Sequence, residues 1–157
     1  MNFSVADICD ELKEKVQVFD AGMKSYGGKS KAYGKIRTVE IYGDNSSLIE
    51  LLKQSGNGDI AVVNVDARQI AVVGDKLMAI AKKNNWTAIV VNGFVRDTDI
   101  TKNIDVGLWA VGTYPRKSFE KKTGIIGKDF HFFGVNFKQG DYLYADNDGL
   151  ILLNKSI

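Results

Sequence analysis

In some segments of the chain, apolar side chains recur at every third or fourth position. In other segments, apolar and polar side chains alternate, or apolar side chains follow one another without a break. The first pattern is typical of an amphipathic helix. It predicts helices at three places: residues 5–15 with Ser4 as the N-cap, residues 47–54, and a segment that opens at Gly74-Asp75 and closes at Asn84-Asn85.

The remaining apolar segments are typical of strands. Residues 36–42 alternate apolar and polar side chains, as a half-buried strand does. Residues 60–65 and 86–92 are unbroken runs rich in β-branched side chains, suited to strands buried on both faces. One predicted helix lies between these two runs, so the order favours a parallel crossover. Shorter β-like segments follow at residues 131–137, 141–144 and 150–153. The pattern predicts an α/β fold with a central mixed sheet.

The composition fits a single compact domain over residues 1–157. Hydrophobic residues make up 45% of the chain, and the net charge of +2 is too small to indicate nucleic acid or an anionic membrane as the main partner. The N-terminus lacks a signal-peptide pattern, and no apolar stretch reaches the roughly 18 residues of a membrane span. We therefore expect a cytoplasmic protein.

Several kinds of site are excluded by residue counts. Cys9 is the only cysteine, so no intramolecular disulfide and no cysteine-based zinc site can form. His131 is the only histidine, and no nucleophile-elbow pattern accompanies it. We interpret Cys9 as a buried helix residue and His131 as a packed or surface residue. One basic cluster is interpreted as a solvated loop, with a partner-binding patch as the alternative: Arg116, Lys117, Lys121 and Lys122.

Two loops fall where ligands of open α/β sheets bind, at the carboxyl ends of buried strands. One loop precedes Asp75, and the other, expected as a turn beginning at Gly93, carries Arg96 and Asp97. The helix opening at Gly74 offers free backbone N–H groups to a carboxylate or phosphate. Arg96 can clamp an oxo acid through its planar fork of donors. Asp97 is an oxygen ligand of the type that Mg²⁺ accepts.

Together these groups suit enolate chemistry. A divalent ion and an arginine beside a keto oxygen would stabilise the charge that develops when a carbon–carbon bond breaks. The same residues also have a purely structural interpretation, with Asp75 as a helix N-cap and Arg96-Asp97 as a solvated turn. Spacing alone leaves both interpretations open.

Similarity to a known family extends over nearly the whole chain. Asp75, twenty further residues and Arg96-Asp97 match an Asp-x20-Arg-Asp signature, and the flanking residues match as well. Similar segments occur at residues 7–10, 26–28, 38–39, 44–45, 140–146 and 148–149. The chain thus resembles the family that holds the regulator of ribonuclease E activity A (RraA) and the metal-dependent 4-hydroxy-4-methyl-2-oxoglutarate aldolases.

This resemblance implies a three-layer β/β/α swivelling-domain fold, assembled as trimers or pairs of trimers with sites at subunit boundaries. It implies that the pyruvyl carboxylate binds the backbone of four residues: Gly74, Asp75, Lys76 and Leu77. Arg96 would contact the substrate and stabilise the enolate. Asp97 would hold Mg²⁺ or Mn²⁺, while Asp75 would help to place a water used in proton transfer.

Two features depart from the family pattern. Residues 64–68 (Asn-Val-Asp-Ala-Arg) replace a stretch that is usually rich in glycine, which bears on the size of the pocket. Family aldolases also draw an acidic residue from the neighbouring subunit, and the sequence does not identify that residue here.

The resemblance implies two functions of different kinds. The first is a divalent-metal-dependent lyase that cleaves 4-hydroxy-4-methyl-2-oxoglutarate to pyruvate, with oxaloacetate decarboxylation through the same enolate. The alternative is a non-enzymatic regulator that binds ribonuclease E and restrains RNA turnover. The retained Asp75…Arg96-Asp97 signature favours the enzyme.

Overall fold

The computed structural model describes residues 2–157. Its helices are α1 (Val5–Leu12), the 3-10 turn η1 (Lys13–Lys15), α2 (Ser46–Lys53), α3 (Asp75–Lys83) and α4 (Thr98–Thr101). Its strands are β1 (Gln17–Val18), β2 (Lys24–Ser25), β3 (Ala32–Glu40), β4 (Ile60–Asn64), β5 (Ala71–Val73), β6 (Ala88–Val95), β7 (Gly107–Thr113), β8 (Ile125–Ile126), β9 (Phe130–Phe132), β10 (Val135–Phe137), β11 (Tyr142–Asp146) and β12 (Gly149–Leu153).

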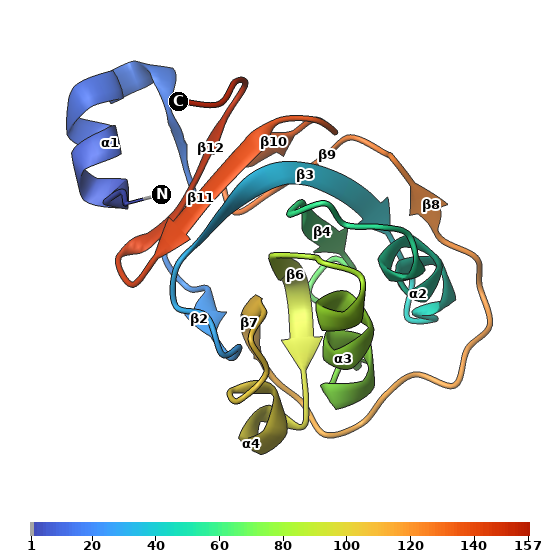
Figure 1. Cartoon of the computed structure of the whole chain (residues 1–157). Helices are drawn as coiled ribbons and strands as arrows, with labels where there is room; N and C mark the ends of the chain where they lie inside the picture. Colours follow the sequence, from blue (N-terminus) through green and yellow to red (C-terminus); the bar gives the residue numbers. More distant parts are fainter. Residues whose placement is uncertain (1) are drawn as a thin grey trace.

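One large mixed sheet organises the chain (Figure 1). Its strands follow the order β1-β12-β11-β3-β4-β6-β7-β2, with β5 beside β6 and β8 beside β3. The central pairs β3–β4, β4–β6 and β6–β7 are parallel, which confirms the expected crossover. Strands β4 and β6 are the unbroken apolar runs, and their side chains are buried on both faces.

Strand β3 belongs to both halves of the sheet. Its first residues, 32–35, pair with β11, and its later residues, 36–40, pair with β4. The sheet therefore folds over itself, and β3 forms the curved strand across the middle of Figure 1.

Each face of the parallel strands has a different cover. Helices α2 and α3 pack on one face, where Leu48, Leu51 and Met78 meet side chains of the central strands. The other face packs against β11, β12 and the β9–β10 hairpin, including Phe137 and Leu143. These layers are the predicted three-layer β/β/α arrangement. Helix α1 covers the outer side of β11 and β12.

Several boundaries agree with the sequence analysis. Helix α1 ends at Leu12 and continues as η1 to Lys15, and the Ser4 side chain accepts a hydrogen bond from the Asp7 N–H. Helix α2 begins one residue earlier than expected. Helix α3 lies between Gly74 and Asn84, as expected. No helix among residues 2–157 is long and apolar enough to cross a membrane.

Two expectations were wrong. Gly93 does not begin a turn, because β6 continues through it to Val95 across an irregularity in its pairing with β7. Residues 131–137 form a hairpin rather than one strand, since Phe133 and Gly134 adopt positive φ angles of 49° and 73°. Apolar periodicity gives no signal for such a tight turn between aromatic residues.

Candidate functional site

A pocket of about 400 Å³ opens where α3 begins and β6 ends. All six residues selected from the sequence line it: Gly74, Asp75, Lys76, Leu77, Arg96 and Asp97. Asp75 and Arg96, with twenty residues between them, thus meet at one edge of the sheet, as the crossover topology requires. Their roles toward a ligand stay a prediction.

Gly74 lets the two loops approach each other. It is the N-cap residue of α3, and a Cβ at this position would overlap the Asp97 carboxylate oxygen Oδ2. The helix itself is held in place by Leu77 and Met78, which are buried against the sheet. A larger residue at Gly74 would therefore have to displace the Asp97 side chain.

The first turn of α3 presents backbone donors to the pocket. The Asp75 N–H donates to Asp97 Oδ2 at 3.3 Å. The N–H groups of Lys76 and Leu77 have no protein acceptor within residues 2–157. Free N–H groups at the positive end of a helix are suited to a carboxylate ligand.

Asp97 sits in a left-handed backbone conformation, with φ 60° and ψ 33°. Its carbonyl oxygen accepts the N–H groups of Ile100 and Thr101, both at 2.9 Å, so α4 fixes it from behind. The carboxylate itself is exposed to solvent. An aspartate tolerates this conformation better than most residues do.

Arg96 is fixed by its backbone and only lightly by its side chain. Its N–H donates to the Val73 carbonyl at 2.9 Å, which ties it to β5. The half-buried guanidinium donates through Nη1 to the Pro115 carbonyl at 3.2 Å. Its other donors remain available to a ligand in the pocket.

The residues present fit a hydrated Mg²⁺ or Mn²⁺ ion. Within residues 2–157, no three Asp, Glu, His or Cys side chains converge on one point, so the chain offers no closed cage of its own. Asp97 supplies one exposed carboxylate, and its Oδ1 accepts no hydrogen bond in the described part of the chain. Mg²⁺ commonly binds through one or two carboxylates and keeps several waters. The oxygen donor also disfavours softer metals.

The pocket wall beside α2 comes from Asp44 and Asn45. Asn45 Nδ2 donates to the Val72 carbonyl at 3.1 Å, which fixes the start of α2 against β5. The Asp44 carboxylate accepts the Ser46 N–H at 2.9 Å and the Lys122 N–H at 3.2 Å. The hydrogen bond from Ser46 is the main cause that lowers the Asp44 pKa below its usual value.

Residues 114–124, which we call the strap, form the remaining wall. Four of its residues line the pocket: Lys117, Ser118, Glu120 and Lys121. Its basic cluster was expected to be a solvated loop or, alternatively, a partner-binding patch, so its place at the pocket was not predicted from the sequence. The basic residues were the only sequence signal for a role of this segment. The local sequence does not determine that a long irregular segment packs against the end of a helix distant in the chain.

Residues 64–68, which depart from the glycine-rich pattern, do not line the pocket. Asp66 and Ala67 adopt positive φ angles of 54° and 51° without glycine. Arg68 Nη1 donates a hydrogen bond to the Tyr42 carbonyl, and Nη2 lies 3.6 Å from Glu120 Oε2 on the strap.

Cys9 and His131 lie away from the pocket. Cys9 is half-buried on α1, where burial raises its thiol pKa. His131 is exposed, with Nδ1 at 2.8 Å from Asn136 Oδ1. Cys9 is therefore less buried than expected, and His131 is a surface residue, one of its two expected placements.

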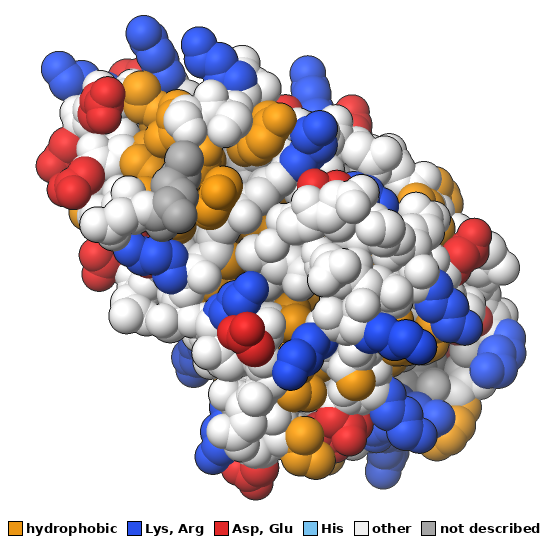
Figure 2. All heavy atoms as spheres, viewed as in Figure 1, with side chains coloured by type: hydrophobic (Ala, Val, Ile, Leu, Met, Phe, Trp, Pro, Cys, Tyr) orange, Lys and Arg blue, Asp and Glu red, His pale blue; other side chains and the backbone are white. Residues whose placement is uncertain are grey.

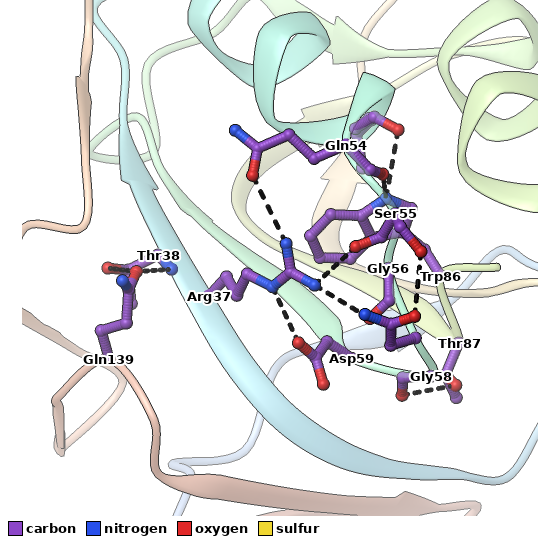
Figure 3. A network of polar contacts seen from close by, with 12 residues as sticks. Arg37, Thr38, Gln54, Ser55, Gly56, Gly58, Asp59, Trp86, Thr87 and Gln139 are labelled. Atoms are coloured by element: carbon purple, nitrogen blue, oxygen red, sulfur yellow. Dashed lines mark hydrogen bonds and ion pairs between the residues drawn. The ribbon is translucent and has the colours of Figure 1, made fainter. Parts of the chain in front are cut away.

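A second polar cluster surrounds Arg37 at the opposite edge of the sheet (Figure 3). Its Nε lies 2.7 Å from Asp59 Oδ2, and Nη2 donates to the Ser55 and Gly56 carbonyls at 2.6 and 3.1 Å. The guanidinium also stacks over Trp86, 4.6 Å from the ring centroid. This arginine joins the α2–β4 loop to the start of β6.

Over nearly its whole length, the chain is similar to one family of known proteins. The family model described as Aldolase/RraA matches residues 5–152. A Laribacter hongkongensis protein, provisionally named 4-hydroxy-4-methyl-2-oxoglutarate aldolase, is 39% identical over 152 residues, covering 96% of each chain. A Bacillus cereus protein with the same provisional name is 37% identical over 156 residues, covering 99% of this chain and 98% of that one.

Two solved structures are similar along their whole length. The crystal structure named S-adenosylmethionine:2-dimethylmenaquinone methyltransferase, from Geobacillus kaustophilus, has a TM-score of 0.94 and 33% identity, and covers 99% of this chain and 97% of its own. The structure named the RNA-processing inhibitor RraA, from Thermus thermophilis, has a TM-score of 0.93 and 30% identity, and covers 100% and 96%. The names of these relatives describe three different activities.

Proposed function

Since the chain belongs to the Aldolase/RraA family, we propose that it is a divalent-metal-dependent lyase acting on pyruvate-derived 2-oxo acids. It would cleave 4-hydroxy-4-methyl-2-oxoglutarate into two molecules of pyruvate, and decarboxylate oxaloacetate to pyruvate and CO₂. The observation that carries this proposal is the meeting of Arg96, Asp97 and the open N-terminus of α3 in one pocket.

The pyruvyl carboxylate is bound first by the backbone of α3. The N–H groups of Lys76 and Leu77 donate to its oxygens, since the Asp75 N–H is already used by Asp97. The absence of a Cβ at Gly74 leaves the helix end open. The helix dipole adds a favourable interaction with the negative charge.

Arg96 then stabilises the negative charge on the oxygen of the substrate as the carbon–carbon bond breaks. Its guanidinium donates to the keto oxygen of the bound oxo acid, and the donation strengthens as this oxygen becomes an enolate oxygen. Its anchor on the Pro115 carbonyl pre-orients the side chain. A divalent ion held at Asp97 would supply Lewis-acid polarisation of the same oxygen.

Asp75 is suited to the proton transfer. It is half-buried at the rim of the pocket, one residue from the proposed carboxylate contacts. Its carboxylate orients the water that exchanges a proton with the substrate hydroxyl or with the enolate carbon.

Pyruvate release tests the proposal directly. We expect release from both substrates with Mg²⁺ or Mn²⁺, and none above the metal-only rate with EDTA. Asp97→Asn keeps the size and backbone preference of the residue but removes the charge, so turnover should fall at least about 100-fold. The exposed Asp148→Asn, on the β11–β12 turn, is the matched control. Release that ignores both EDTA and Asp97→Asn would contradict the metal site.

A second candidate function is regulation of ribonuclease E. It is supported by the similarity to the structure named the RNA-processing inhibitor RraA. We would measure RNA cleavage by ribonuclease E with and without this protein, and with the Arg96→Ala variant. Inhibition retained by a lyase-inactive variant would support a separate regulatory surface. No binding and no inhibition would remove this candidate.

The proposed assembly is a homotrimer in the cytoplasm, singly or as a pair of trimers. It is supported by apolar side chains left exposed on or beside the strap: Phe119 (79%), Ile125 (45%) and Ile126 (37%). Light scattering coupled to size-exclusion chromatography should give three or six times the chain mass. A monomer at micromolar concentration would contradict this assembly.

A further inference from the structure

We propose that Lys117 and Lys121 on the strap form a subsite for the second carboxylate of a 2-oxo dicarboxylate. The inference rests on the proposed lyase function and names the part of the substrate that these two residues recognise. It concerns a wall of the pocket that faces solvent and is built from a segment without regular secondary structure.

The strap is held in place on both sides of the two lysines. Before them, the Arg116 carbonyl accepts the Ala71 N–H at 2.8 Å, and Ala71 and Lys117 form an isolated parallel bridge. After them, the Lys122 N–H donates to Asp44 and the Gly124 N–H donates to Ser47 Oγ at 2.9 Å. The backbone that carries Lys117 and Lys121 is therefore fixed at the pocket.

The two anions on the strap side of the pocket, Glu120 and Asp44, have other partners. Glu120 pairs with Arg68, and the Asp44 carboxylate accepts two backbone N–H groups. Lys121 lies near enough to Asp44 to contribute to its lowered pKa, but the two form no ion pair within 4.0 Å.

Neither lysine has an ion pair or side-chain hydrogen bond to another residue among residues 2–157. The Lys117 ammonium lies 5.5 Å from the Phe119 ring centroid, a weak contact for an exposed pair. The ammonium groups of Lys117 and Lys121 are thus left without a carboxylate partner at the strap, as is that of Lys76 at the α3 end of the pocket.

The charges of the pocket are then distributed between two ends. At the α3 end, free N–H groups and Arg96 match one carboxylate and its keto group. At the strap end, Lys117 and Lys121 offer charge-assisted donors to a second carboxylate. In Figure 2, Lys and Arg side chains gather at the lower right, over the region where Figure 1 draws α2, α3 and the strap. The arrangement favours dicarboxylates over monocarboxylates.

The test separates the two ends of the pocket. Exchange of the methyl protons of pyruvate in D₂O, followed by NMR, needs only the α3 end, Arg96 and the metal. Cleavage of 4-hydroxy-4-methyl-2-oxoglutarate needs both ends. We would compare wild type, Lys117→Ala, Lys121→Ala and the double variant. Lys122→Ala is the matched control, because its side chain stacks on Tyr42 and does not line the pocket.

We expect kcat/KM for cleavage to fall about tenfold in single variants and up to about 100-fold in the double variant, mainly through KM, with exchange unchanged. Lys121→Arg should recover part of the loss. Unchanged cleavage in the double variant would overturn the subsite, as would an equal loss of exchange. If the wild type catalyses neither reaction with Mg²⁺ or Mn²⁺, the lyase function itself fails and the subsite falls with it.

Discussion

Two arginines lie at opposite edges of the same parallel sheet, and their surroundings differ sharply. Arg37 has an ion pair, two backbone carbonyls and the face of Trp86 as partners (Figure 3). Arg96 has one carbonyl contact and a pocket. The N–H donors of Arg37 are used by partners within the protein, whereas most of those of Arg96 are free to bind a ligand. The number of protein partners of each guanidinium therefore distinguishes an arginine that stabilises the fold from one that is available to a ligand.

The largest effect should come from Arg96→Ala. Turnover of oxaloacetate and 4-hydroxy-4-methyl-2-oxoglutarate should fall about 100- to 1000-fold, because the donor to the developing enolate oxygen is lost. The melting temperature should change little, since one carbonyl contact is removed. Steady-state kinetics and thermal unfolding on the same preparation would check both. Arg116→Ala, on the strap but outside the pocket lining, is the control.

Arg37→Ala should show the opposite pattern. Its removal leaves the half-buried Asp59 carboxylate and two carbonyls without their donor, so unfolding free energy should fall by about 2–3 kcal/mol. Activity per folded molecule should stay near wild type. Urea unfolding monitored by the fluorescence of Trp86 and Trp109 would measure the loss. A loss of activity without a loss of stability would contradict the assignment of Arg37 to stability and of Arg96 to the pocket.

Gly74→Ala tests the close approach at the pocket. The added Cβ would overlap Asp97 Oδ2 and move the carboxylate away from the Asp75 N–H. We expect the Mg²⁺ concentration for half-maximal activity to rise about tenfold, with a stability change of about 1 kcal/mol or less. Metal titration of pyruvate release would measure this. An unchanged metal requirement would show that Asp97 has room to move without cost.

The smallest effect is expected for Lys128→Met. Lys128 Nζ lies 2.7 Å from Glu40 Oε1, and this contact is the main cause that lowers the Glu40 pKa. A lowered carboxyl pKa contributes stability above its unfolded value and loses it as pH falls through the folded value. The variant should be slightly less stable than wild type at pH 7, and the difference should begin to shrink as pH falls below the ordinary glutamate pKa of about 4.3. Urea unfolding at a series of pH values would follow this. A stability difference that does not shrink as the pH is lowered into the acid range would contradict the ion-pair origin.

Much of the site could be predicted because its parts are local. Helix α3 has a clear apolar face and follows a glycine, and Arg96-Asp97 follows a buried apolar run, so both loops could be placed at one edge of the sheet. The resemblance to the family connected them to a reaction. The three-layer arrangement also came from that resemblance, because strand patterns alone do not show that β3 serves two layers.

The strap could not be predicted, for a physical reason. Its position depends on hydrogen bonds to Ala71, Asp44 and Ser47, all more than forty residues earlier in the chain. No local periodicity encodes such contacts. The short strand β5 was missed for a similar reason, since three residues are too few to show a period.

The left-handed backbone of Asp97 constrains how this position can vary during evolution. Substitution there must satisfy the backbone before any chemistry is considered, and only glycine, asparagine and aspartate meet that condition at low cost. A library randomised at residue 97 and selected for folding alone should retain mainly these three. Adding selection for pyruvate release should leave aspartate. In a lineage that abandoned the lyase, drift at this position would therefore favour asparagine or glycine, and such a replacement would mark the loss.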